Sequence, residues 1–261
     1  MPARQPAADA RDRFSTRVAD YIRYRPGYPS AALDWLVADH GLAPGQTVAD
    51  VGSGTGIFTA LLLARGCEVF AIEPNAEMRR AAASLLGGEP RFHSVAGSAD
   101  ATGLPPASVD WVFAAQAFHW FDQAAAGPEF RRVLRPGGRV GLLWNSRRTD
   151  GPFHERYEAF LRGHAIDYEK VRHEGVEEDG SVRRFLGSSA AWRTFANSQR
   201  LDWDGLLGRV RSSSYMPGAD HDGYQPMVAA LRGLFDQFAE NGHVELGYET
   251  RVYFGQPPLG A

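Results

Sequence analysis

The chain has 261 residues, of which 44% are hydrophobic, and its 28 basic residues nearly balance 31 acidic ones. This composition excludes a disordered chain, and no run approaches the roughly 18–20 consecutive apolar residues of a membrane span. Residues 1–13 are polar and lack the apolar region of a secretory signal. The single cysteine, Cys67, excludes an internal disulfide and a multi-cysteine metal site. We therefore expect a soluble, cytoplasmic protein without a metal ion or a membrane partner.

Nucleic-acid binding is also disfavoured by composition, because the net charge of −3 and the lack of a dense basic run leave no electrostatic footprint.

In chain order, apolar spacing first predicts helices over residues 11–24 and 30–40. Strands that alternate with helices follow, and the last of these helices is predicted over 122–134. The five predicted strands are 47–51, 67–72, 91–96, 109–115 and 139–144. This alternation predicts right-handed crossovers and a parallel sheet.

The regular pattern ends near residue 145. Residues 146–190 are polar, charged and aromatic, which predicts a mostly helical insert with a mobile loop at 174–181. A strand over 194–203, a helix over 224–240 and a strand over 243–254 complete the prediction. The chain is thus expected to form an α/β fold with seven strands.

The most informative segment joins the first predicted strand to the helix after it. Asp50 is followed by Gly52, Gly54 and Gly56, which let the backbone turn sharply and approach a ligand closely. Because residue 57 is not glycine, the spacing departs from the G-x-G-x-x-G dinucleotide fingerprint. Glu73 ends the next strand, where a carboxylate accepts two hydrogen bonds from a ribose diol. The pattern predicts nucleoside binding, although glycine loops also occur in plain strand–helix turns.

Further segments occur in a characteristic order: Phe14 and Tyr21, then 24–29, 115–122, 132–138, 142–145 and 212–215. With the glycine loop, they resemble the class I S-adenosylmethionine-dependent methyltransferases, type 11 subgroup, which includes trans-aconitate methyltransferase-like small-molecule enzymes. The resemblance spans most of the chain and is weakest over the insert.

This resemblance implies a Rossmann-like seven-stranded methyltransferase sheet with helices on both faces, in a single domain over 1–261. It divides the domain into N-terminal lid helices (1–46), a cofactor-binding half (47–145), an insert over the acceptor pocket (146–190) and closing strands and helices (191–261).

The resemblance also implies roles for the residues of the glycine loop. Gly52, Gly54 and Gly56 would pack against the methionine and ribose portions of S-adenosylmethionine. Asp50 would hold the ammonium group of this cofactor, and Glu73 would bind the ribose hydroxyls.

The adenine contacts are less closely specified by the resemblance. Asn75 would line the adenine edge. Many relatives carry an aspartate after the third strand, whereas Ser98 stands at that position here. The contact with the adenine amino group therefore falls to Ser98, the backbone of Ala99, or a shifted Asp100.

At the methionine end, the resemblance implies that Ala115 and Gln116 flank the cofactor. The N-terminal segment would fold over the cofactor, with Tyr21 lining the pocket and Arg25 meeting the carboxylate. The alternative for Arg25 is a surface residue before a proline turn.

Catalytic residues leave a weaker signal, because methyl transfer mainly requires alignment in a dry pocket. His119 and Trp120 follow the fourth strand at the edge where α/β sheets bind ligands. We expect His119 to serve as a possible general base and Trp120 to form a pocket wall, unless both simply pack under the next helix. Arg147 and Arg148 are expected to be surface residues; the alternative is that they bind an acidic substrate.

The predicted activity is therefore methyl transfer from S-adenosylmethionine to a small molecule, with S-adenosylhomocysteine as product. O- or N-methylation is favoured, and a carboxylate or a hydroxyl is among the candidate acceptor groups. The protein is expected to be a monomer or a weak homodimer. The alternatives are a protein that binds this cofactor without transferring methyl groups, and a nicotinamide-dependent oxidoreductase.

Overall fold

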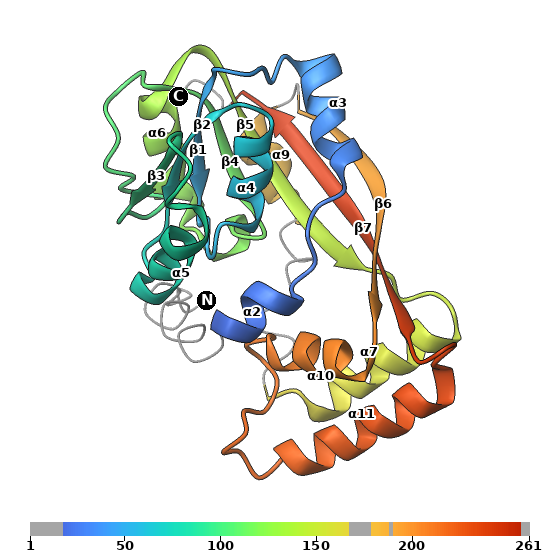
Figure 1. Ribbon diagram of the computed structural model, residues 1–261. Coiled ribbons are helices and arrows are strands. Elements are labelled where there is room, and N and C mark those ends of the chain that lie inside the picture. The colour runs from blue at the N-terminus through green and yellow to red at the C-terminus, as the bar shows by residue number, and fades with distance from the viewer. Residues whose placement is uncertain (1–17, 167–178, 188–189, 257–261) are drawn as a thin grey trace.

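A computed structural model describes residues 18–166, 179–187 and 190–256, and its centre is one seven-stranded sheet (Figure 1). The strand order is β3-β2-β1-β4-β5-β7-β6. The strands are β1 Thr47–Val51, β2 Glu68–Ile72, β3 Phe92–Val95, β4 Val109–Ala115, β5 Leu134–Arg147, β6 Ala191–Leu201 and β7 Val244–Gly255. The prediction of seven strands is confirmed. The sheet is mixed rather than parallel throughout, because β7 pairs antiparallel with both β5 and β6.

Helices cover both faces of the sheet, as predicted. The described helices are α2 Val18–Tyr24, α3 Ser30–His40, α4 Ile57–Ala64, α5 Ala76–Leu86, the 3-10 helix η2 Phe118–Trp120, α6 Gln123–Val133, α7 Pro152–His164, α9 Ser181–Leu186, α10 Trp203–Arg211 and α11 Tyr224–Phe238. Among these described helices, none combines the length and the apolar character needed to cross a bilayer.

Alternation along the strands builds two apolar layers, because successive side chains point to opposite faces of a sheet. On one face, Leu33 of α3 and Leu62 of α4 belong to the same buried cluster as Val48 of β1. On the other face, Phe130 of α6 packs in a cluster with Val112 of β4. Burying each such side chain contributes about 1.5–3 kcal/mol. The predicted lid helix over 30–40 is therefore part of the α/β layers, since its apolar side is buried against the sheet.

A third cluster lies where β6 and β7 extend beyond the rest of the sheet (Figure 1). There α7, α10 and α11 bury residues such as Leu206 and Leu231 against Leu246 of β7. Helix α2 packs on α10 so closely that a Cβ at Gly208 would lie 2.2 Å from the ring of Tyr24. This contact holds the N-terminal helix between the helical cluster and the sheet.

Three boundaries differ from the sequence-based prediction. Strand β5 begins at Leu134 rather than at the predicted residue 139, and an irregularity lies where the register moves from Val109–Leu134 to Trp111–Arg139. Strand β6 ends at Leu201, because the Asp202 side chain caps α10 by accepting a hydrogen bond from Gly205 N at 2.7 Å. Helix α10 itself was not predicted.

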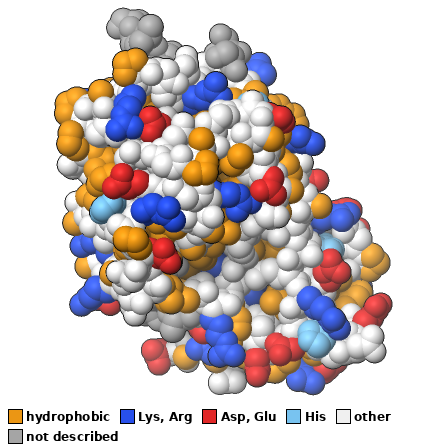
Figure 2. Space-filling model, turned by 45° about the horizontal axis from the view of Figure 1, so that its top comes forward, with side chains coloured by type: hydrophobic (Ala, Val, Ile, Leu, Met, Phe, Trp, Pro, Cys, Tyr) orange, Lys and Arg blue, Asp and Glu red, His pale blue; other side chains and the backbone are white. Residues whose placement is uncertain are grey.

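The predicted insert contains α7 and α9 as its described helices. Most of the predicted mobile loop at 174–181, and the first part of the helix predicted over 11–24, lie outside the described residues. Acidic and basic side chains are interspersed over the face of the molecule in Figure 2.

Candidate active site

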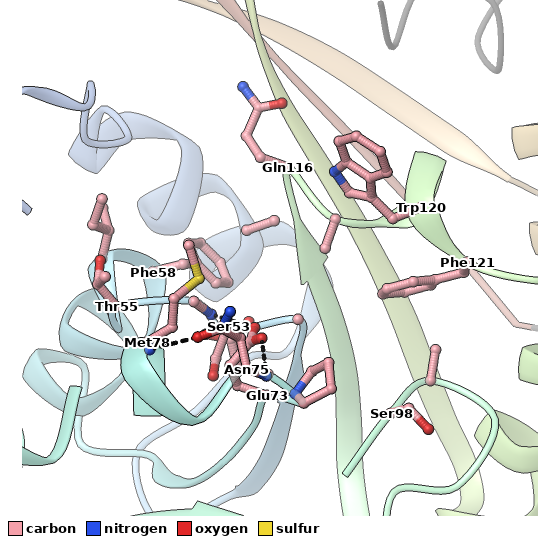
Figure 3. A pocket seen from close by; sticks show the side chains of 18 of the residues that line it. Ser53, Thr55, Phe58, Glu73, Asn75, Met78, Ser98, Gln116, Trp120 and Phe121 are labelled. Atoms are coloured by element: carbon pink, nitrogen blue, oxygen red, sulfur yellow. Dashed lines mark hydrogen bonds between the residues drawn. The ribbon is translucent and has the colours of Figure 1, made fainter. Parts of the chain in front are cut away.

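A cavity of about 760 Å³ opens at the carboxyl ends of β1, β2 and β4, beside α2 and α10 (Figure 3). This is the edge at which open α/β sheets bind ligands. The predicted site residues that line the cavity are Tyr21, Arg25, Asp50, Gly52, Gly54, Glu73, Asn75, Ser98, Ala99, Ala115, Gln116 and Trp120. Gly56 and His119, which were predicted with them, do not belong to the lining.

Glu73 follows β2, and each of its two carboxylate oxygens accepts a hydrogen bond from a backbone N–H group. Its Oε2 accepts from Gly54 N at 3.0 Å, and its Oε1 accepts from Asn75 N at 2.8 Å. The side chain is only 7% exposed. Because a carboxylate has about four acceptor positions, these two bonds orient Glu73 while it retains capacity for a ligand.

Asp50 lies on β1 and is buried, with one oxygen satisfied by the protein. Its Oδ2 accepts from Thr59 Oγ1 at 2.6 Å, whereas Oδ1 is buried without a hydrogen-bond partner among the described residues. Burial raises the pKa of Asp50 to about 7; the Thr59 hydrogen bond opposes this shift, and the charge of Glu73 adds to it. A buried acceptor without a donor is costly, so Oδ1 marks a place where a ligand donor would be stabilised.

The loop glycines have two different roles. Gly52 has a φ of 70°, and a Cβ there would lie 2.6 Å from the Cβ of Ala117, so the loop approaches β4 too closely for a side chain. Gly56 has a φ of 86°, but a Cβ there would lie 2.7 Å from Leu86 Cδ1 of α5. Gly56 therefore permits the close packing of the loop on α5, and it lies outside the lining of the cavity.

Arg25 follows α2 and reaches the cavity from the N-terminal side. Its guanidinium lies over the ring of Tyr21, 4.7 Å from the centroid, and Nη2 donates to Ser212 O at 2.9 Å. Its Nε is buried without a hydrogen-bond partner among the described residues. Burial, followed by the charge of Arg209, lowers the pKa of Arg25. The side chain therefore offers an unsatisfied donor and a positive charge that an anionic group would stabilise.

The segment after Arg25 is fixed to the sheet through Asn145 at the end of β5. Asn145 Nδ2 donates to Gly27 O at 3.0 Å, and Asn197 Nδ2 donates to the same oxygen at 2.9 Å. Thr250 and Asn197 also donate to Asn145 Oδ1. Side chains from three strands thus hold this segment over the cavity.

The residues expected around an adenine ring lie together at the ends of β2 and β3. Asn75 caps α5 by accepting from Met78 N at 3.0 Å and also lines the cavity. Ser98, Ala99 and Asp100 all belong to the lining. All three residues named for the adenine contact therefore face the same cavity.

Gln116 adopts an uncommon backbone conformation at the end of β4. Its φ is 57°, a region that costs a non-glycine residue about 1–3 kcal/mol. The amide Nε2 donates to Asn145 O at 3.1 Å. In Figure 3 Gln116 and Trp120 flank the cavity on the β4 side, while Glu73 and Asn75 lie together on the β2 side.

His119 lies beside the cavity rather than in its lining. Its Nδ1 accepts from the Nε1 of buried Trp144 at 3.4 Å, and its ring centroid lies 5.0 Å from that of Trp120. With Nδ1 accepting, a neutral imidazole carries its proton on Nε2 and has no second acceptor nitrogen. The geometry is that of a residue that supports Trp120 and Trp144.

The predicted surface character of Arg147 and Arg148 is only partly met. Arg148 pairs with Asp150 and is half-exposed, whereas Arg147 is 16% exposed and pairs with Glu158 at 3.1 Å.

The lining residues that the sequence-based reasoning missed include Thr55 and Arg209. Thr55 lies in the glycine loop, and its Oγ1 is buried without a hydrogen-bond partner among the described residues. Arg209 lies on α10 and is 4% exposed. Thr55 could have been found from the sequence, because it stands between two glycines of the loop. Arg209 could not, because it lies 136 positions after Glu73 in a helix with no motif.

Comparisons with known proteins agree on one class. Residues 49–142 match the family model described as "Methyltransferase domain". An uncharacterized methyltransferase of Mycobacterium tuberculosis is 45% identical over 134 residues, which cover 51% of this chain and 52% of that protein. The chain thus matches about half the length of this relative. One from Geobacillus kaustophilus is 31% identical over 205 residues, which cover 74% of this chain and 93% of that protein.

Among solved structures, a putative type II methyltransferase from Anaeromyxobacter dehalogenans has a TM-score of 0.65 and 26% identity. The match covers 89% of this chain and 98% of that one.

Proposed function

Because the chain belongs to the class I S-adenosylmethionine-dependent methyltransferases, we propose that it transfers the methyl group of this cofactor to a small-molecule acceptor bound in the same cavity. A hydroxyl, carboxylate or amine of the acceptor is the favoured site of transfer.

The observation that carries the proposal is a carboxyl group and a guanidinium group in one cavity, each with a buried atom that lacks a hydrogen-bond partner among the described residues. Asp50 Oδ1 is a buried acceptor and Arg25 Nε is a buried donor, each without a hydrogen-bond partner among the described residues. The amino-acid end of S-adenosylmethionine carries an ammonium and a carboxylate. The ammonium would pair with the ionised form of Asp50 and the carboxylate with Arg25, so the residues present fit the cofactor.

The same cavity accounts for the rest of the cofactor. Glu73, oriented by two backbone N–H groups, would accept the hydrogen bonds of the ribose diol. Gly52 leaves room for the ligand where a side chain would collide with Ala117. Ser98 and Asn75 lie where the adenine ring would extend.

When bound, the cofactor supplies an electrophilic methyl group on a sulfonium centre. The protein's part is to align the acceptor in line with that methyl group and to exclude water, and orientation alone is worth about 7–11 kcal/mol. Trp120 and Gln116 wall the acceptor side, and Tyr21 and Arg25 cover the N-terminal side. A general base is needed only for an acceptor that arrives protonated.

The proposal is tested by calorimetric titration with S-adenosylmethionine, S-adenosylhomocysteine and NADH. We expect the first two to bind and NADH not to compete. The protein is then incubated with methyl-labelled cofactor and a small-molecule extract, and labelled products are identified by mass spectrometry. Binding of NADH in preference to S-adenosylmethionine would contradict the proposal, and binding without any labelled product would favour a non-catalytic cofactor-binding protein.

A further inference from the structure

The chain forms a tight turn over residues 98–101, after β3 and at the edge of the candidate active site. Ser98 N donates to Ala101 O at 3.1 Å, and Ala101 N donates to Ser98 O at 3.2 Å, so the chain reverses direction over two residues. Those two residues, Ala99 and Asp100, line the cavity together with Ser98, which is labelled in Figure 3. The proposed function places the adenine ring of the cofactor against this turn.

A glutamate of α6 anchors the turn from outside the cavity. Thr102 follows the turn directly and is fully buried. It donates twice to Glu129 Oε1, from its backbone N at 2.9 Å and from its Oγ1 at 2.5 Å. The two arms of the turn approach closely, since a Cβ at Gly97 would lie 2.8 Å from Thr102 O. The place of the turn is therefore set by a residue 27 positions further along the chain.

Arg132 holds the Glu129 carboxylate in a fixed orientation. Its Nε donates to Glu129 Oε2 at 2.6 Å, and its Nη2 donates to Oε1 at 2.7 Å and to Leu104 O at 2.8 Å. Hydrogen bonds from Arg132 lower the pKa of Glu129 to about 2, so the carboxylate is ionised at neutral pH. Hydrogen bonds between charged groups are stronger than neutral ones. Arg132 opens the 132–138 segment recognised in the sequence, and no residue of that segment lines the cavity.

Glu129 has the contacts of a supporting residue rather than those of a ligand-binding one. Thr102 and Arg132 together donate four hydrogen bonds to it, which fills the roughly four acceptor positions of a carboxylate. Unlike Glu73, it does not belong to the lining of the cavity. Its helix does reach the cavity, because residues 123–125 at the start of α6 belong to the lining. Glu129 thus ties the turn to an element that is itself part of the site.

We infer that Glu129 is a positioning residue that holds the turn at 98–101, through Thr102, in the conformation that binds adenine and makes the cavity selective for this base. The inference rests on the proposed function, since that function assigns the turn to the adenine ring. A site built to form hydrogen bonds with a ligand rejects an analogue that cannot form them. This rejection requires donors and acceptors that are already in place, because ordering a loose segment on binding costs affinity.

The experiment titrates the full chain with S-adenosylhomocysteine and with S-inosylhomocysteine, in which a carbonyl replaces the amino group of adenine. Wild type should bind S-adenosylhomocysteine at least about 10-fold more tightly, because the analogue leaves a hydrogen-bonding group of the turn without its partner. Glu129→Ala removes the whole anchor and should weaken S-adenosylhomocysteine binding roughly 10-fold. Thr102→Val removes only the hydroxyl bond and should weaken it roughly 5-fold. Binding of the analogue should change by less than about 2-fold in both variants, so that selectivity falls.

Two further variants and a second measurement separate positioning from general stability. Thr102→Ser keeps the hydroxyl donor and should bind both ligands as wild type does. Asp110→Ala removes a carboxylate that also accepts from a backbone N–H, at 2.8 Å, and pairs with an arginine, at 2.7 Å, but lies near the opposite end of β4. Its selectivity should equal that of wild type. In ligand-free Glu129→Ala the amide hydrogen of Thr102 should exchange at least about 10-fold faster than in wild type, because its acceptor is gone.

The inference is overturned if wild type does not prefer S-adenosylhomocysteine to the analogue, or if Thr102→Val keeps the wild-type selectivity. Equal losses of affinity for both ligands would also overturn it, since they would show general destabilisation. Unchanged amide exchange in Glu129→Ala would show that the turn does not depend on this anchor. Thermal melting shows whether Glu129→Ala folds, and if it does not, Thr102→Val and Thr102→Ser decide. If wild type binds neither ligand, the proposed function itself fails.

Discussion

The buried carboxyl group of Asp50 makes the stability of the ligand-free protein depend on pH in a predictable direction. Its pKa is raised from an ordinary 3.8 to about 7, chiefly by burial. Between these values the unfolded chain has released the proton while the folded protein retains it. The contribution of Asp50 to stability is therefore complete below pH 3.8 and is lost as the pH rises to 7.

The magnitude follows from the size of that interval. Each pH unit between the two pKa values changes the free energy of unfolding by about 1.4 kcal/mol. From pH 5 to pH 7 the loss is about 3 kcal/mol, and little further change follows above pH 7. Because Asp50 is 1% exposed, solvent screening does not reduce this figure much.

The perturbation is Asp50→Asn, which keeps an acceptor for the Thr59 hydroxyl and cannot ionise. Urea unfolding of the ligand-free protein is measured at pH 5, 6, 7 and 8. We expect the stability of the variant relative to wild type to rise by about 3 kcal/mol between pH 5 and pH 8. Asp100→Asn is the control, because Asp100 lines the same cavity but is exposed.

Cofactor affinity should increase with pH, in contrast to the stability of the ligand-free protein, because the ammonium group pairs with the ionised form of Asp50. If the ammonium group pairs with the ionised carboxylate, binding at pH 6.5 releases a proton from wild type. Calorimetry in buffers of different ionisation enthalpy measures this release, which Asp50→Asn should abolish together with much of the affinity. A stability difference that is constant from pH 5 to pH 8 would refute the reasoning, since it would mean that Asp50 does not retain its proton on folding.

Three further variants test the site. Glu73→Ala should weaken S-adenosylmethionine binding roughly 10- to 150-fold, because a hydrogen bond to a charged group is worth about 1.5–3 kcal/mol, whereas Glu68→Ala on the same strand should bind normally in the same titration. Gly52→Ala places a Cβ 2.6 Å from the Cβ of Ala117, at a residue whose φ is 70°. We therefore expect a lower melting temperature and little cofactor binding. A variant as stable and as active as wild type would contradict this close approach. His119→Gln should keep turnover within about 10-fold of wild type with the same pH profile, because Nδ1 accepts from Trp144, and a loss of about 10²–10⁴ would instead restore the role of general base.

The residues proposed to hold the cofactor could be placed at one cavity from the sequence because their signals are local. Asp50, the loop glycines and Glu73 lie at the ends of two neighbouring parallel strands, and the ends of such strands meet at one edge of the sheet. Apolar runs bounded by glycine and proline also located the strands to within a few residues, except where a cap or an irregularity changed a boundary. These features depend on short stretches of chain whose conformations follow from residue type.

The acceptor side depended on contacts between distant segments, which no short pattern encodes. Arg209 enters the cavity only because α10 packs on α2, and Asn145 holds Gly27 only because β5, β6 and β7 lie side by side. His119 looked like a base from its position after β4, yet its ring faces a tryptophan of β5. Residue spacing along the chain therefore determined which residues line the cavity at the ends of β1 and β2, whereas long-range packing decided which charges line it from α2 and α10.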